Sequence, residues 1–167
     1  MVHAESVATE IERKFLVAAP PPREASGRAE LRQGYVAEDG PVSVRVRITE
    51  QSALLTVKAG RGRSRTEVEV PLSMEEADAL WACTEGRRLS KTRLSVPLGD
   101  DSDGAAAGGA LVAELDVYHG ALAGIRTVEV EFESEAAAER FHPPAWFGRE
   151  VTGDPAWTNA ALARRPR

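Results

Sequence analysis

Apolar and polar residues alternate along most of this chain with a period of two. Such alternation is typical of β-strands, because successive side chains point to opposite faces of a sheet. Roughly eight strands are enough to close a small barrel without free edges. We therefore expect a mainly β (α+β) fold, an eight-stranded antiparallel closed barrel. The alternation predicts strands over residues 9–17, 30–37, 42–50, 53–59, 64–70, 87–97, 111–119 and 125–133.

Three short segments break this alternation and have the features of helices. Ser73, with Glu76 three residues later, predicts a capping box at the start of one helix. A second helix is expected over residues 134–141, ending before a pair of prolines. A third is expected to begin near Pro155, a residue type favoured in the first turn of a helix. We expect these few helices to flank the barrel and cover its outside.

The length of the chain, 167 residues, fits a single domain. We expect this domain to span residues 1–167, with flexible tails at 1–7 and 164–167. Residues 99–109, rich in Asp, Gly and Ala, are expected to form a flexible loop within it.

Composition excludes several classes of protein. The chain is 43% hydrophobic, so it can bury a core and is not a disordered chain. Its lone cysteine, Cys83, excludes an internal disulfide and a multi-cysteine zinc cluster. The formal net charge of −5 makes nucleic acid an unexpected partner. There is no long apolar run and no signal peptide, so we expect no membrane association and a cytoplasmic location.

Charged residues occupy one face of nearly every predicted strand, opposite an apolar face. Residues two apart share a face, so carboxylates lie in line on some strands and cations on others. On any single strand, this pattern is usual for a sheet with one solvated face. The series along the chain is Glu10, Glu12 and Lys14; Arg45 and Arg47; Lys58; Glu67 and Glu69; Lys91 and Arg93; Glu114 and Asp116; Glu129 and Glu131.

Taken together, these faces are better explained by a charged interior. If the helices cover the apolar faces outside the barrel, the charged faces must line its lumen. Charges of both signs are costly to desolvate unless they stay wet and paired, so we expect the lumen to bind a ligand. Carboxylates suit hard cations such as Mg²⁺ or Mn²⁺, and Arg and Lys suit phosphate oxygens. The residues alone therefore predict a metal–polyphosphate site.

These residues also resemble a known family. The segment Glu10-Ile11-Glu12-Arg13-Lys14 is similar to the E-x-E-x-K signature of the CYTH, or triphosphate tunnel metalloenzyme, superfamily. The resemblance continues in order over nearly the whole chain. It covers Arg32 to Tyr35, Arg45-x-Arg47, Thr56-Val57-Lys58, Glu67-x-Glu69, Lys91-Thr92-Arg93, Glu114-x-Asp116, Glu129-x-Glu131, Glu150-Val151-Thr152 and Asn159.

The resemblance implies an enzyme, a divalent-metal-dependent triphosphatase most similar to short bacterial members that hydrolyse inorganic tripolyphosphate. It implies that Lys91 and Tyr35 activate water, with Glu114 and Asp116 contributing to this or to a second metal; the alternative for Tyr35 is a packing residue of its strand. The roles of Arg65, Glu67, Glu69, Arg87 and Arg88 stay open. The implied metal ligands are Glu10, Glu12, Glu114, Asp116, Glu129 and Glu131. The implied phosphate-binding residues are Lys14, Arg45, Arg47, Lys58, Lys91 and Arg93.

Other functions remain open at this stage. A class IV adenylyl cyclase of the same superfamily would need an adenine pocket, for which the sequence shows no clear signal. Thiamine triphosphatase, RNA 5′-triphosphatase or another organic triphosphatase would differ mainly at the tunnel entrance. A binding module that captures polyphosphate without turnover is a further alternative, although its carboxylates would repel a polyanion. A homodimer is also left open.

Overall fold

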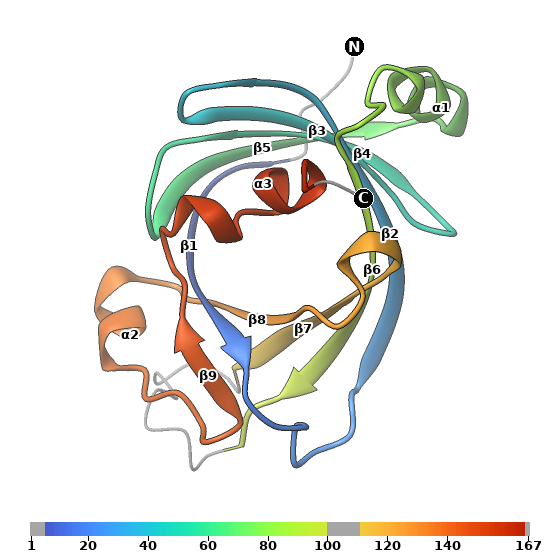
Figure 1. Cartoon of the computed structure of the whole chain (residues 1–167). Helices are drawn as coiled ribbons and strands as arrows, with labels where there is room; N and C mark the ends of the chain where they lie inside the picture. The colour runs from blue at the N-terminus through green and yellow to red at the C-terminus, as the bar shows by residue number, and fades with distance from the viewer. Residues whose placement is uncertain (1–5, 100–110, 166–167) are drawn as a thin grey trace.

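The predicted strands close into a barrel in the computed structural model, which describes residues 6–99 and 111–165 (Figure 1). The strands are β1 (Ser6–Val17), β2 (Gly27–Asp39), β3 (Val42–Ile48), β4 (Ala53–Ala59), β5 (Ser64–Leu72), β6 (Arg88–Pro97), β7 (Val112–Tyr118), β8 (Arg126–Glu131) and β9 (Phe147–Glu150). Their order in the sheet is β5-β4-β3-β2-β6-β7-β8-β1-β9, and all pairs run antiparallel.

Strand β1 closes the barrel because it pairs with two others along its length. Residues 6–11 pair with β5, and residues 12–16 pair with β8. The prediction of an eight-stranded antiparallel barrel is therefore confirmed. The ninth strand, β9, pairs only with β1 and was not predicted. Its four residues are too few to show a period of two.

Helix α1 (Met74–Ala82) covers the outer face of one side of the barrel. The predicted capping box at its start is confirmed, because the side chain of Ser73 accepts from the amide of Glu76 and the Glu76 carboxylate accepts from the amide of Ser73. Beneath α1, Val46 and Ile48 of β3 are buried with Ala77 of the helix. Burying side chains of this size provides most of the driving force for closing this side.

Helix α2 (Glu135–Arg140) and strand β9 cover the opposite side. The apolar faces of β1, β7 and β8 pack there against aromatic residues that follow α2. Phe15 of β1 lies 5.1 Å from Phe147 and 6.4 Å from Phe141, measured between ring centroids. The apolar half of the alternating pattern thus faces outward and is buried, which leaves the charged half facing the lumen.

The third helix departs from our expectation that the helices cover the outside. Helix α3 (Asn159–Ala163), which follows the 3-10 turn η2 (Pro155–Trp157), lies within the ring of strands (Figure 1). Leu162 of α3 packs against Tyr35 and Tyr118, whose side chains point to the interior. The helix turns inward because these aromatic rings offer an apolar surface at one end of an otherwise charged lumen.

The structure describes part of each expected tail at 1–7 and 164–167. Residues 6 and 7 belong to β1, and Arg164 forms an ion pair with Glu38. Residues 100–109 of the expected loop, and residues 1–5 and 166–167 of the tails, lie outside the described residues. Within the part that is described, no helix has the length and apolar character needed to cross a lipid bilayer.

Candidate functional site: a charged cavity inside the barrel

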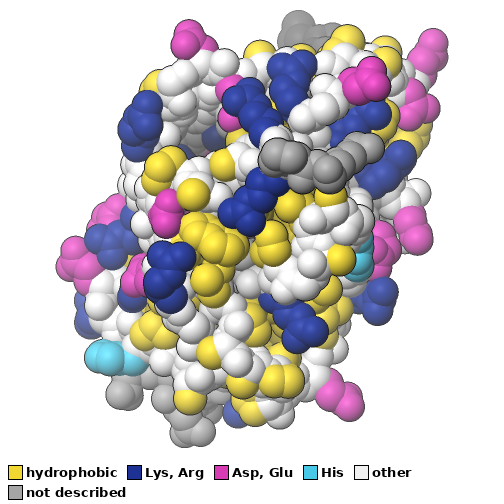
Figure 2. All heavy atoms as spheres, viewed as in Figure 1, with side chains coloured by type: hydrophobic (Ala, Val, Ile, Leu, Met, Phe, Trp, Pro, Cys, Tyr) yellow, Lys and Arg dark blue, Asp and Glu magenta, His cyan; other side chains and the backbone are white. Residues whose placement is uncertain are grey.

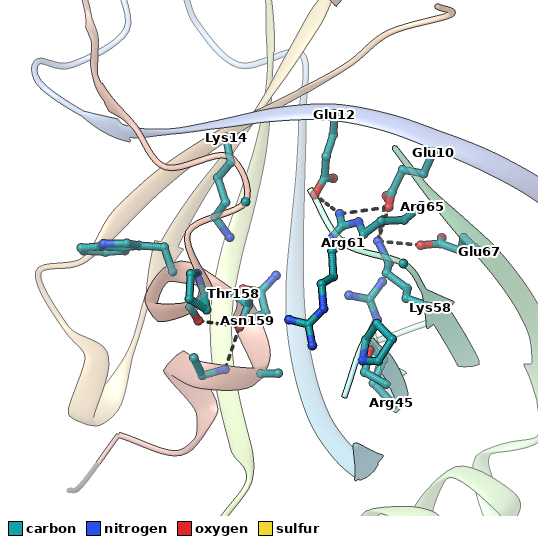
Figure 3. Close-up of a pocket in the computed structure, with 18 of the residues that line it drawn as sticks. Glu10, Glu12, Lys14, Arg45, Lys58, Arg61, Arg65, Glu67, Thr158 and Asn159 are labelled. Atoms are coloured by element: carbon teal, nitrogen blue, oxygen red, sulfur yellow. Dashed lines mark hydrogen bonds and ion pairs between the residues drawn. The ribbon is translucent and has the colours of Figure 1, made fainter. Parts of the chain in front are cut away.

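The barrel contains a cavity of about 530 Å³ into which charged side chains from every wall project (Figure 3). All residues predicted for the site border it except Lys91 and Asp116, which lie on the lumen face of their strands but are completely buried and do not reach the open cavity. This gathering follows from the strand alternation, which places every second residue of each strand on the lumen side. The central geometric prediction, a shared lumen for the acidic and basic residues, agrees with the structure.

Strand register decides which charges meet. Glu12 lies opposite Glu131, and Lys14 lies opposite Glu129, where β1 pairs with β8. The ammonium of Lys14 is 2.9 Å from the carboxylate of Glu129. Burial opposes the charge of Glu129, but Lys14 and then Arg93 overcome it and hold the Glu129 pKa well below its usual range. Glu129 is therefore a carboxylate at any pH near neutrality.

A second cluster of paired charges lies where β1 meets β5. The ammonium of Lys58 is 2.6 Å from Glu10 and 2.6 Å from Glu67. Arg65 contacts both Glu10, at 3.2 Å, and Glu12. The role of Arg65 was left open from the sequence, and the structure makes it the bridge between the two carboxylates of the E-x-E motif. The sequence pattern indicates that Arg65 faces the lumen, because Arg65 shares a strand face with Glu67.

Arg45 and Arg47 on β3 differ from the cations Lys14, Lys58, Arg65 and Arg93 of the other strands because they have no carboxylate within ion-pair distance in the described chain. Both Nε atoms are buried without a hydrogen-bond partner. Burial, with repulsion from Arg45 and Arg93, lowers the pKa of Arg47 to about 10. Two buried guanidinium groups with unsatisfied donors are unfavourable unless an anion reaches them. They form an anion site for which the described residues supply no ligand.

The carboxylates Glu12 and Glu131 show the opposite imbalance. Burial, followed by repulsion from Glu129, raises the pKa of Glu12 to about 7. Burial and the nearby Glu10 also raise the pKa of Glu131, for which the described residues supply no ion-pair partner. Neighbouring carboxyl groups with raised pKa values are stabilised in their charged form when a cation binds between them. Their oxygens suit a hard divalent ion.

The carboxylates are not arranged as a finished metal site. Among residues 6–99 and 111–165, no three acidic, histidine or cysteine side chains converge closely enough to hold an ion. The reason lies in the pairs described above, since Glu10 and Glu129 instead contact lysines and arginines. The oxygen donors fit Mg²⁺ or Mn²⁺ in kind. Coordination would require some of these carboxylates to turn from their cationic partners.

Lys91 and Asp116 form an ion pair behind the cavity surface, and Arg93 joins Asp116 with an Nε to oxygen distance of 2.8 Å. Burial lowers the pKa of Lys91 to about 7 even though Asp116 opposes this. The ammonium lies 5.6 Å from the ring centroid of Tyr118, directly opposite on β7. No described contact joins Lys91 to Tyr35, because the register places Leu31 of β2 beside Lys91.

Tyr35 instead lies opposite Arg45 and borders the cavity. Burial raises the pKa of its phenol, and Arg45 only partly offsets this. The phenol is therefore neutral and can donate a hydrogen bond. Sequence reasoning missed Tyr118, whose hydroxyl donates to Asn159 of α3 at 2.6 Å and so holds that helix in the lumen. Only the strand register, which the alternation does not specify, could have revealed this contact.

Viewed along the barrel, basic side chains and apolar side chains gather around the C-terminal segment, while acidic side chains lie mainly toward the edges (Figure 2). The face that opens into the lumen is therefore more basic than the net charge of −5 suggests. Local clustering of cations of this kind attracts small anions even to an acidic protein.

A closed barrel whose interior presents unsatisfied guanidinium groups beside crowded carboxylates is a tunnel suited to a polyanion with bound cations. Comparison with known proteins agrees with this class. Residues 8–150 match the model of the CYTH domain. The chain therefore belongs to the CYTH domain family, whose members generally depend on a metal.

The chain is homologous to inorganic triphosphatases over nearly its whole length. It is 44% identical to the inorganic triphosphatase of Nitrosomonas europaea over 157 residues, which cover 93% of this chain and 97% of that protein. It is 33% identical to the inorganic triphosphatase of Acetivibrio thermocellus over 160 residues, 94% of each chain. A crystal structure of an inorganic triphosphatase, 41% identical, superposes with a TM-score of 0.69 and covers 95% of this chain and 97% of its own.

More distant structures share the fold alone. A conserved hypothetical protein from Pyrococcus furiosus is 19% identical, with a TM-score of 0.55 over 78% of this chain and 83% of its own. At that level of identity the barrel is common to both proteins, and the similarity carries no information about the substrate.

The raised pKa of Glu12 leads to a prediction for the metal-free protein. Between the usual carboxyl pKa of 4.5 and the folded value of about 7, the folded state holds a proton that the unfolded state has lost. The free energy of unfolding therefore falls as pH rises through this window. Glu12→Gln removes the free-energy cost of ionising this buried carboxyl group. In EDTA at pH 8 the variant should therefore melt about 5 °C above the parent. Near pH 4.5 the two should melt together.

Differential scanning calorimetry at both pH values measures this effect. Glu133→Gln, a change at an exposed position just beyond β8, is the matched control and should alter neither melting temperature. A Glu12→Gln variant that is less stable than the parent at pH 8 would show that the ion pair with Arg65 outweighs the carboxylate repulsion.

Proposed function

We propose that this protein hydrolyses linear triphosphates, with inorganic tripolyphosphate as the preferred substrate and a divalent cation as cofactor. The observation that supports this most directly is the pair of buried guanidinium groups, Arg45 and Arg47, left without anions in a cavity that also holds crowded carboxylates. Phosphate oxygens satisfy guanidinium donors in a bidentate geometry. The inorganic triphosphatase relatives support the choice of substrate.

In this proposal the basic residues hold the phosphate chain along the lumen. Arg45 and Arg47 bind through their free donors, and Lys14, Lys58 and Arg93 turn from their carboxylates toward phosphate oxygens. Water then breaks one phosphoanhydride bond of tripolyphosphate, and the products are pyrophosphate and orthophosphate. Positioning and charge stabilisation supply most of the rate, because the protein forms no covalent bond with the substrate.

The acidic residues would hold the cofactor, which we propose to be Mg²⁺ or Mn²⁺. Its chemistry is to offset phosphate charge and polarise phosphate oxygens. The residues proposed to bind it from the cavity wall are Glu10, Glu12, Glu114, Glu129 and Glu131. Asp116 lies on the same lumen face but is completely buried and bonded to Lys91 and Arg93. We therefore propose that it acts by positioning Arg93.

The substrate assignment can be tested with one set of assays. The purified chain is incubated with tripolyphosphate, ATP, thiamine triphosphate or pyrophosphate, each with Mg²⁺, Mn²⁺ or EDTA, and the products are separated. We expect orthophosphate and pyrophosphate from tripolyphosphate, at a higher kcat/KM than from any organic triphosphate. Cyclic AMP from ATP would show a cyclase instead, and tight binding without any product would show a binding module.

The proposal keeps Tyr35 as a residue that orients the attacking water, with Lys91 acting from its buried position in the interior beside the cavity. Tyr35→Phe retains the packing against α3 and removes only the hydroxyl. The neutral phenol can contribute one hydrogen bond, so we expect kcat for tripolyphosphate to fall about tenfold with KM nearly unchanged. Steady-state kinetics and a melting curve check this. An unchanged kcat would show that Tyr35 serves only in packing.

A further inference from the structure

One more arginine reaches the cavity from the turn between β4 and β5. Arg61 borders the cavity, is exposed, and forms no hydrogen bond or ion pair within the described chain. Figure 3 shows its side chain extending into the cavity between Asn159 and Arg45. Lys58 and Arg65, the cations on the strands flanking this turn, are both paired with carboxylates. Arg61 is thus a cation aimed into the site, and residues 6–99 and 111–165 offer it no partner.

The turn that carries Arg61 is held at one end of the barrel by its neighbours. Gly60 donates a backbone hydrogen bond to the carbonyl of Pro41, at 3.1 Å, in the turn between β2 and β3. Gly62 lies against Gly153, where an added Cβ would be 3.5 Å away. These three turns, residues 40–42, 60–62 and 151–155, all border the cavity, and we call them the tunnel mouth.

Backbone geometry and an outer ion pair direct Arg61 inward. Gly60 and Gly62 have φ values of +117° and +79°, which favour glycine and bend the turn over the cavity. Arg63, two residues further on, points to the outside, where its Nε is 2.8 Å from Glu135 of α2. This contact ties the turn to the outer wall.

Arg61 and Arg47 lie at different depths in the lumen. Arg45 and then Arg47 follow along β3 from the mouth turn at 40–42 into the barrel, whereas Arg61 is on the mouth itself. A linear phosphate chain with one end at Arg47 and the other toward the mouth would meet Arg61 last. In an inorganic chain, that outer group is a terminal phosphate with full charge. In an organic triphosphate, it is an ester-linked phosphate with less charge and a bulky substituent.

We propose that Arg61 binds the outer, non-reacting phosphate and so favours inorganic triphosphate over esterified triphosphates. This inference rests on the proposed function and adds a determinant of specificity at the tunnel mouth. Arg61 is distant from the reacting group and contributes to binding. Its removal should therefore appear in KM, because binding that is equal in the ground and transition states leaves kcat unchanged.

The test compares Arg61→Gln with the parent on tripolyphosphate and on ATP. A charge-assisted hydrogen bond to phosphate leads us to expect a KM for tripolyphosphate raised about tenfold, with kcat changed less than about twofold. The KM for ATP should change less than about threefold. Arg61→Lys keeps the charge and should recover part of the tripolyphosphate KM. Arg126→Gln removes an exposed cation that does not border the cavity, and it should leave all values near those of the parent.

Equal effects on both substrates, or no effect on tripolyphosphate, would overturn the inference. Failure of the proposed function would give a different result, because the parent protein itself would then release no phosphate from tripolyphosphate. In that case isothermal titration of tripolyphosphate into the parent and Arg61→Gln proteins still tests the contact. A dissociation constant raised about tenfold supports it, and equal constants refute it.

Discussion

Replacing Arg47 by alanine is expected to lower kcat/KM for tripolyphosphate by about 100- to 1000-fold, the range seen when one preorganised donor to a transition-state anion is removed. Arg47 is inside the lumen, and its Nε has no partner in the described chain. The guanidinium therefore loses no internal bond when it engages a phosphate, and all of its donors are available for charge that develops during the reaction.

The fold of the Arg47→Ala variant should be retained. Burial and the neighbouring cations Arg45 and Arg93 lower the pKa of Arg47, which shows that its charge is unfavourable in the ligand-free lumen. Removing it should leave the melting temperature equal to or above that of the parent. This opposition between stability and activity is expected of a residue kept for function.

A matched control is available on the adjoining strand. Arg32 of β2 pairs in register with Ile48, and its guanidinium faces outward, 5.3 Å from the ring centroid of Trp81. Arg32→Ala removes the same charge outside the lumen and should change kcat/KM less than about twofold. Initial-rate measurements of phosphate release compare the two variants. Similar losses in both would show that overall charge, and not the lumen position, determines activity.

Removing divalent metal should have the other large effect. In EDTA we expect phosphate release from tripolyphosphate to fall by at least about a thousandfold, because a divalent ion is needed to offset the repulsion between the phosphate chain and the lumen carboxylates. Adding Mg²⁺ or Mn²⁺ in excess should restore it. Release that continues undiminished in EDTA would show that the lysines and arginines suffice without metal.

The carboxylates proposed as ligands can be examined without relying on turnover. Glu131→Gln should weaken Mn²⁺ binding about tenfold, as measured by electron paramagnetic resonance of free Mn²⁺. Glu131 is the clearest choice because it has no cationic partner in the described chain, so its loss disturbs no ion pair. Glu133→Gln, two residues further on, is exposed and should bind Mn²⁺ like the parent. Equal binding by all three proteins would remove Glu131 from the ligand set.

The local pattern predicted most of the charged side chains that line the cavity. Period-two alternation was enough to place Glu10, Glu12 and Lys14 on a common face, and the same held for Arg45 with Arg47. Alternation is a property of the extended backbone itself, so it survives whatever the strand pairs with. The existence of an apolar face on nearly every strand then required an outer cover, which α1 and α2 provide.

The pairing of charges could not be obtained in the same way. Glu12 meets Glu131 and lacks a full complement of cations, while Glu10 meets Lys58 and Arg65 and is well neutralised. All of these residues look alike in the sequence. The difference arises from register between strands that are far apart along the chain, and register depends on packing and turn geometry across the whole sheet.

The inward position of α3 has the same origin. Its residues contain no marker that distinguishes a helix inside a barrel from one outside it. Tyr35 and Tyr118 determine its place, because they meet across the lumen and create an apolar surface on which Leu162 packs.

The amino-acid sequence by itself determined the strands, their two faces and the kinds of charge that line the tunnel, since each depends on residues only a few positions apart. Only the tertiary structure decided which charges are already paired, which guanidinium groups and carboxylates still need a ligand, and that Lys91 is buried in the interior beside Tyr118. These depend on distances between strands remote in sequence, and such distances exist only once the barrel has closed.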